Sequence, residues 1–141
     1  MQSFQELGQI FNRKYAQFKY PEKPGLLYDP IRYIMSMGGK KIRPLLTLAA
    51  YNIYQSDVEV AFEAALSVEV FHNFSLLHDD IMDDADIRRG HPAAHIKYDT
   101  NAAILSGDAM LIIAYQLLEK YPDHLRELFA LFSQTAIEVC E

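Results

Sequence analysis

Hydrophobic residues recur every three or four positions along most of the chain, and no stretch alternates between polar and apolar residues for long. This period is typical of amphipathic α-helices, so the sequence predicts an all-α fold. The first helix is expected to begin at a Ser3 cap and to run to about Phe18. Its apolar stripe consists of Phe4, Leu7, Ile10, Phe11, Tyr15 and Phe18.

Two shorter helices are expected next. The segment 20–25 contains two prolines and a glycine, which is typical of a loop. The second helix has Pro30 near its first turn and ends at Gly38-Gly39. The third is expected over about 43–54, with Pro44 in the first turn, where a missing N–H group is tolerated.

A long helix is predicted over 57–84, with Ser56 as its cap and Glu59 completing a capping box. A polar link over 85–92 follows it.

The last part of the chain is predicted to form two more helices. The first begins at Asn101 or Ser106 and ends near Tyr121, and the second begins at Asp123. The second is still strongly apolar where the chain stops. Residues 1–141 are therefore interpreted as a single helical domain, the truncated N-terminal portion of a longer one.

The composition narrows the class of protein. Half of the 141 residues are hydrophobic, which argues against intrinsic disorder. The 13 Lys and Arg against 19 Asp and Glu residues give a net charge of −6, which argues against general nucleic-acid binding. The N-terminus lacks the apolar run of a signal peptide, and no window is expected to reach the roughly 18 apolar residues of a transmembrane segment. With Cys140 as its single cysteine, the chain is expected to be cytoplasmic.

Five carboxylates crowd the end of the predicted long helix: Asp79, Asp80, Asp83, Asp84 and Asp86. A helix C-terminus already carries partial negative charge, and like charges one turn apart repel by about 0.2–0.5 kcal/mol per pair, so the arrangement favours bound cations. Asp79 and Asp83 share one helix face and suit Mg²⁺, which takes one or two carboxylates together with phosphate oxygens. Asp80, rotated by about 100°, is better placed to orient a ligand or water. A solvated acidic helix end is the alternative, but apolar residues interleave the carboxylates.

Basic residues occur at two places that suit a diphosphate. Arg88 and Arg89 follow the carboxylates, and guanidinium groups bind phosphate oxygens in pairs. Gly38-Gly39 allows the backbone to approach a ligand closely. Lys40 and Arg43 come next, at the expected start of a helix, where the dipole favours an anion.

Three further predictions concern the neighbouring polar residues. Lys41 is expected to face solvent. His72 lies seven residues before Asp79 and so on nearly the same helix face, where it could donate a hydrogen bond to a second anion. A packed, hydrogen-bonded core histidine is the alternative for His72. The other histidines with no such alignment are assigned structural or surface roles: His78, His91 and His95.

Four motifs occur in a specific order: Gly-Gly-Lys-Lys-Ile-Arg-Pro over 38–44, Glu-Val-Phe-His over 69–72, Leu-His-Asp-Asp-Ile-Met-Asp over 77–83 and Arg-Arg-Gly-His-Pro over 88–92. Together they resemble the N-terminal half of the trans-isoprenyl diphosphate synthases, which include the farnesyl and geranylgeranyl diphosphate synthases. The resemblance implies the N-terminal part of an isoprenoid-synthase-type helical bundle. It also implies a homodimer.

The resemblance assigns roles to these residues. Asp79 and Asp83 would bind Mg²⁺ with Asp80 supporting them, and Arg88 would contact an allylic prenyl diphosphate. The diphosphate of isopentenyl diphosphate would be held by Lys40, Arg43, His72 and Arg89. The implied reaction is ionisation of the allylic diphosphate, attack by the isopentenyl double bond, and loss of a proton.

Two other functions stay open. A class I terpene cyclase also uses a DDxxD helix, although the motif at 38–44 argues against it because a cyclase has no second diphosphate to hold. A second Asp-rich motif, which members of the family carry, does not follow Asp108. A non-catalytic binding subunit is therefore the other alternative, and the chain alone is expected to be incomplete for turnover.

The resemblance also implies a prediction of product length. In the family, the residues four and five places before the first Asp of DDxxD form the floor of the prenyl tunnel. These are Ser75 and Phe74 here, a small residue beside a bulky one. The pair predicts C15 to C20 products, with C20 favoured. The alternative is that Phe74 packs in the core and the floor is made elsewhere.

Overall fold

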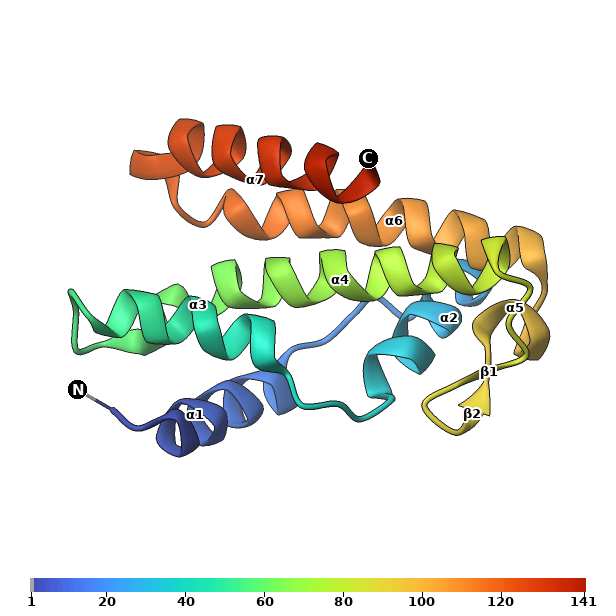
Figure 1. The fold of residues 1–141 in the computed structure, drawn as a ribbon, viewed down its shortest axis with the longest axis horizontal. Coiled ribbons are helices and arrows are strands. Elements are labelled where there is room, and N and C mark those ends of the chain that lie inside the picture. Colours follow the sequence, from blue (N-terminus) through green and yellow to red (C-terminus); the bar gives the residue numbers. More distant parts are fainter. Residues whose placement is uncertain (1) are drawn as a thin grey trace.

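The computed structural model describes residues 2–141, which form seven α-helices, two short 3₁₀ helices and one short hairpin (Figure 1). The elements are α1 (Phe4–Gln17), α2 (Gly25–Ser36), α3 (Ile42–Asn52), η1 (Val58–Ala61), α4 (Phe62–Met82), β1 (Ile87–Arg88), β2 (His91–Pro92), α5 (Ala94–Lys97), α6 (Thr100–Leu118), η2 (Pro122–His124) and α7 (Leu125–Cys140). The predicted all-α class is confirmed.

Helix α4 runs through the middle of the molecule, with α6 and then α7 on one side and α3 and α1 on the other (Figure 1). It packs most extensively on α6. The two helices approach closely because small residues of α6 face α4. A Cβ atom on Gly107 would lie 2.2 Å from Nε2 of His78, so only glycine fits there without displacing the imidazole.

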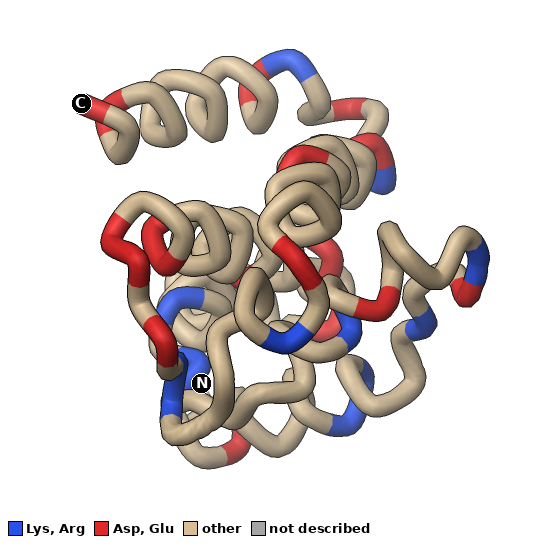
Figure 2. The backbone as a smooth tube through the Cα atoms, turned by 90° about the vertical axis from the view of Figure 1, so that its right-hand side faces the viewer, with Lys and Arg blue, Asp and Glu red and all other residues tan. Residues whose placement is uncertain are grey.

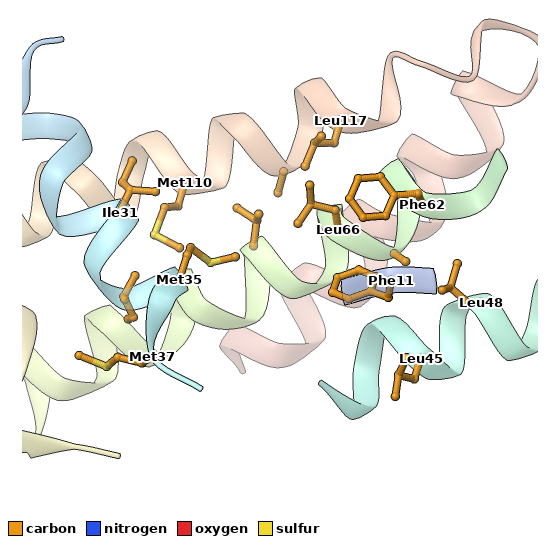
Figure 3. Packing of buried hydrophobic residues seen from close by; sticks show 14 of the residues in the cluster. Phe11, Ile31, Met35, Met37, Leu45, Leu48, Phe62, Leu66, Met110 and Leu117 are labelled. Atoms are coloured by element: carbon orange, nitrogen blue, oxygen red, sulfur yellow. The ribbon is translucent and has the colours of Figure 1, made fainter. Parts of the chain in front are cut away.

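The apolar core lies where α1, α2, α3, α4 and α6 meet. Figure 3 shows buried side chains from these helices converging, among them Phe11, Leu48, Phe62 and Leu117. The rings of Phe11 and Phe62 are 5.5 Å apart between centroids, within the range of favourable aromatic pairs. Burial of these side chains holds together the helices that carry the polar residues of the sequence motifs.

The helix starts show which local signals were read correctly. The Ser3 cap is confirmed, since its side chain accepts from the N–H of Glu6 in a complete capping box. The capping box at Ser56 is wrong, because residues 58–61 form a 3₁₀ helix and α4 begins at Phe62 without a side-chain cap. The carboxylate of Glu59 instead pairs with Arg13 of α1.

Three other boundaries differ from the prediction. Pro30 lies inside α2, because the helix begins at Gly25. Helix α6 begins at Thr100, where Asp99 Oδ1 accepts from the N–H of Ala102 at 2.7 Å, so neither Asn101 nor Ser106 is the cap. The link over 85–92 contains an antiparallel hairpin, in which Arg88 pairs with His91.

The expectation that no window is apolar enough for a membrane span is wrong. Two helical stretches, Val58–Met82 and Thr100–Leu118, are long and apolar enough by length and composition. About half of each window is buried inside the protein, where α4 and α6 pack on one another. Packing in the core therefore accounts for part of the apolar surface of these two helices.

Helix α7, at the top of Figure 2, carries charged residues only near its two ends. None of its residues is fully buried, although Phe132 packs against the core. Its apolar side chains instead help to line a cavity.

Candidate active site

A cavity of about 650 Å³ runs along α4, with α3 and α7 contributing to its walls. Its lining is mostly apolar and includes Phe71, Leu131 and Phe132. Along α4 it extends from Ala64 to Asp79, which is 79 − 64 = 15 residues, or about 22 Å of helix. Of its charged or ionisable lining residues, Asp79 lies at one end, whereas Arg43 and His72 lie together near the middle. The cavity is thus long and mostly apolar, with these groups spread over one half of it.

Asp79 and Asp83 are one helical turn apart at the end of α4, and Asp83 N–H donates to the Asp79 carbonyl at 2.8 Å. Within residues 2–141 neither carboxylate forms an ion pair, and no group of three or more His, Cys, Asp or Glu side chains forms a complete metal-binding cluster. Two uncompensated carboxylates fit a Mg²⁺ ion that takes its other ligands from phosphate and water.

Asp80 has a different environment from its neighbours, since only 2% of the residue is exposed. Both of its carboxylate oxygens accept hydrogen bonds from Arg88, at 3.0 and 3.1 Å from Nε and at 2.5 Å from Nη2. These hydrogen bonds, more than any other influence, raise the pKa of Arg88. Asp80 thus holds a guanidinium group, and its predicted role in orienting a ligand or water stays a prediction.

Arg89 is bound to the glycine-rich segment. Its Nη1 donates to the carbonyls of Met37 at 3.0 Å and Gly38 at 2.6 Å. A Cβ atom on Gly39 would lie 3.0 Å from the same nitrogen, so the glycine makes room for the guanidinium group. The hairpin that carries both arginines is also held at Pro92, whose carbonyl accepts from the hydroxyl of Tyr33 at 2.8 Å.

Arg43 and His72 lie together on the cavity lining, with Nη1 and Nε2 separated by 3.3 Å. Arginine can only donate, so this contact makes Nε2 the acceptor of a neutral imidazole. Burial, followed by the charge of Arg43, lowers the pKa of His72, and the charges of Arg88 and Arg89 add to this effect. The positive charges of all three arginines thus disfavour a charged His72 imidazole.

Lys40 is exposed, whereas Lys41 points into the protein. The prediction that Lys41 faces solvent is therefore wrong. Its Nζ lies 3.2 Å from Oε1 of Glu69, a buried residue of α4. Ion pairing to a buried carboxylate outweighs the preference of the lysine for water.

The same architecture is found in known proteins. Residues 24–141 match the polyprenyl synthetase family model. The chain belongs to this family.

The relatives of this polyprenyl synthetase chain are larger proteins. It is 40% identical over 122 residues to the geranylgeranyl diphosphate synthase of Methanosarcina mazei, covering 84% of this chain and 38% of that protein. It is 37% identical to the geranylfarnesyl diphosphate synthase of Natronomonas pharaonis, covering 96% of this chain and 46% of that protein. A crystal structure of a geranylgeranyl pyrophosphate synthase superposes with a TM-score of 0.95 at 49% identity, covering 99% of this chain and 43% of the other. The polyprenyl synthetase chain therefore spans about two-fifths of the length of its relatives.

The two residues expected to form the tunnel floor have different positions. Ser75 lines the cavity, and its hydroxyl is bonded to the carbonyl of His72. Phe74 is not among the residues that line the cavity. Its ring contacts those of Phe71 and His78, with centroids 5.5 and 4.9 Å away. This matches the alternative in which Phe74 is a core residue, and the aromatic side chains that line the cavity are Phe71 and Phe132.

Sequence reasoning missed the residues that hold the basic groups in place. Glu69 was noted only as part of a motif, and Tyr33 was not singled out. A glutamate in the apolar run of a core helix was an available signal, because a buried carboxylate needs a cationic partner. No local pattern around Tyr33 indicates that its hydroxyl reaches Pro92, 59 residues away.

Proposed function

We propose that the chain supplies the diphosphate-binding part of a trans-prenyltransferase, which condenses isopentenyl diphosphate with an allylic prenyl diphosphate. The observation that carries this proposal is the long apolar cavity, in which Asp79 lies at one end and Arg43 and His72 lie near the middle. A bound prenyl diphosphate would place its charged head toward these three residues and its apolar chain along the apolar lining. The identities of the relatives support the same reaction class.

Two diphosphates would bind to different residues. Asp79 and Asp83 would hold Mg²⁺ and, through it, the allylic diphosphate; bound Mg²⁺ would stabilise negative charge on the leaving group. Arg88, held by Asp80, would contact the same diphosphate through its remaining N–H groups. The diphosphate of isopentenyl diphosphate would be bound by the basic residues around the glycine-rich segment: Lys40, Arg43, His72 and Arg89.

In the proposed reaction, the bond between C1 of the allylic chain and the diphosphate oxygen breaks, and its electron pair leaves with the diphosphate. The double bond of isopentenyl diphosphate attacks C1. Loss of a proton from the adjacent carbon then restores a double bond. The arginine side chains stabilise the charge that develops on the leaving diphosphate, without becoming bonded to it covalently.

The proposal extends to the product and the assembly. The names of the relatives include C20 and C25 synthases, and a C20 product is proposed here. We also propose a homodimer, because several large apolar side chains of α6 and α7 are exposed, among them Leu105, Ile112, Phe129 and Ile137. Light scattering that gives the mass of a single chain at tens of micromolar would contradict the dimer. The cytoplasmic location stays a prediction.

The proposed activity can be tested in the chain extended at its C-terminus to the length of its relatives. Radiolabelled isopentenyl diphosphate is expected to enter an acid-labile prenyl product when farnesyl diphosphate and Mg²⁺ are present. Omission of farnesyl diphosphate serves as the control. A hydrocarbon product formed from the allylic diphosphate alone would indicate a cyclase, and the absence of any product would contradict the proposal.

A further inference from the structure

The basic segment 38–44 sends its three cationic side chains in different directions. Lys40 and Arg43 are exposed, but only 14% of the Lys41 side chain is accessible. Its Nζ lies 3.2 Å from Oε1 of Glu69 and 4.9 Å from the centre of the Tyr15 ring. The Lys41 side chain therefore points into the protein, between the carboxylate of Glu69 and the face of the Tyr15 ring. It cannot contact a ligand bound by Lys40 and Arg43.

Glu69 is 3% exposed on the core helix α4, where an ionised carboxylate is strongly disfavoured without partners. Lys41 supplies the opposite charge. Asn73, one turn further along α4, donates from Nδ2 to Oε1 of Glu69 at 3.1 Å and to its carbonyl at 2.8 Å. This orientation leaves Oδ1 of Asn73 buried without a hydrogen-bond partner in the part of the chain that the structure describes. The side-chain amide of Asn73 is thus oriented to donate a hydrogen bond to the carboxylate of Glu69.

The backbone at Lys41 is unusual. Its φ of 50° and ψ of 34° place it in the left-handed region, which side chains other than glycine rarely adopt. Such a conformation persists where surrounding contacts enforce it. Lys41 occupies the cap position of α3, so this turn fixes both where the helix starts and how the flanking residues leave it. The contacts of the Lys41 side chain in this turn are the buried ion pair with Glu69 and the face of the Tyr15 ring.

One turn of α4 contacts the basic segment 38–44 through two residues. Glu69 and His72 are three residues apart and hence neighbours on the helix surface. Glu69 holds Lys41, and Nε2 of His72 lies 3.3 Å from Nη1 of Arg43. A shift of Lys41 would therefore also displace Arg43 from the imidazole and from the cavity lining.

We infer that the buried Lys41–Glu69 pair positions the basic segment 38–44 for its anionic ligand, and that Lys41 and Glu69 are positioning residues that do not touch the ligand. The inference rests on the proposed function for the identity of that ligand, a diphosphate.

The test uses the 141-residue chain and inorganic pyrophosphate without Mg²⁺, measured by calorimetry. Glu69→Gln and Lys41→Met are each expected to weaken pyrophosphate binding about tenfold, because small displacements of binding groups lose affinity steeply. Each also leaves a buried charge unpaired and lowers the melting temperature. The double variant removes both charges, so we expect it to recover the melting temperature while its pyrophosphate affinity stays low. Glu59→Gln, which removes an exposed ion pair with Arg13, is the matched control and is expected to bind as the unaltered chain does.

A second readout does not depend on ligand binding. In the double variant Arg43 is expected to leave His72, which NMR follows as the loss of nuclear Overhauser effects between the two side chains, because removal of the Glu69 charge changes the pKa of His72 by itself. Near-normal pyrophosphate affinity in the double variant, with the contact between Arg43 and His72 kept, would overturn the inference and leave the proposed site standing. If the unaltered chain binds no pyrophosphate either with or without Mg²⁺, the proposed function fails. The contact between Arg43 and His72 still decides whether the pair positions the segment.

Discussion

Asp80→Asn is expected to lower prenyl diphosphate turnover at least about a hundredfold in the chain extended to the length of its relatives. Both oxygens of Asp80 accept hydrogen bonds from Arg88, and the buried carboxylate compensates the charge of that guanidinium group. An amide accepts through one oxygen only and carries no charge. Arg88 would then lose the orientation in which its remaining N–H groups meet the leaving diphosphate.

The matched control is Asp84→Asn, which removes a carboxylate from the exposed residue that follows Asp83. It is expected to keep turnover within about threefold. Asp80→Asn is also expected to lower the free energy of unfolding by about 1–3 kcal/mol, because Asp80 is buried. Melting curves at the assay temperature therefore have to show that the variant is folded. Turnover within threefold of the unaltered enzyme would contradict the role given to the Asp80–Arg88 pair.

Ser75→Phe is expected to shorten the main product from C20 to C15. Ser75 lines the cavity one turn before Asp79, so an aromatic ring at this position would occupy space needed by the growing tail. The product lengths are measured by chromatography after removal of the diphosphate. An unchanged distribution would show that the cavity along α4 does not hold the tail.

Phe74→Ala is the matched variant for this test. The sequence assigned Phe74 to the tunnel floor, but its ring lies against Phe71 and His78 instead of the cavity. We therefore expect Phe74→Ala to leave the product length nearly unchanged and to reduce stability by about 3–5 kcal/mol at most, since the ring is only partly buried. Longer products in this variant would restore the floor assignment.

The helices could be predicted because their signals are local and repeat along the chain. The Ser3 cap and the period of the apolar residues around Phe11 were sufficient to place α1. The predicted capping box at Ser56 is wrong although Ser56 and Glu59 have the required spacing. The carboxylate of Glu59 forms an ion pair with Arg13 of α1 instead. Such a competition between a local and a distant partner leaves no trace in the local pattern.

The polar residues of the site could be found from sequence, but their partners could not. Charge crowding at Asp79 and Asp83 and the adjacent arginines predict a site for cations and phosphate. Which aspartate meets Arg88 depends on the turn after α4, where Asp84 adopts a positive φ and the chain reverses into the hairpin. Lys41 shows the same limit, since its direction is set by Glu69, 28 residues away.

We propose that Asp79, Asp83 and the neighbouring basic residues form a site for Mg²⁺ and a diphosphate. This claim is tested most directly by titrating pyrophosphate into the 141-residue chain with and without Mg²⁺, after subtraction of titrations without protein. Pyrophosphate is expected to bind at least about tenfold more tightly with Mg²⁺, since the two carboxylates leave coordination positions open for phosphate oxygens. The gain is expected to disappear in Asp79→Asn. Equal pyrophosphate affinity with and without Mg²⁺, or a gain that survives in Asp79→Asn, would contradict the claim.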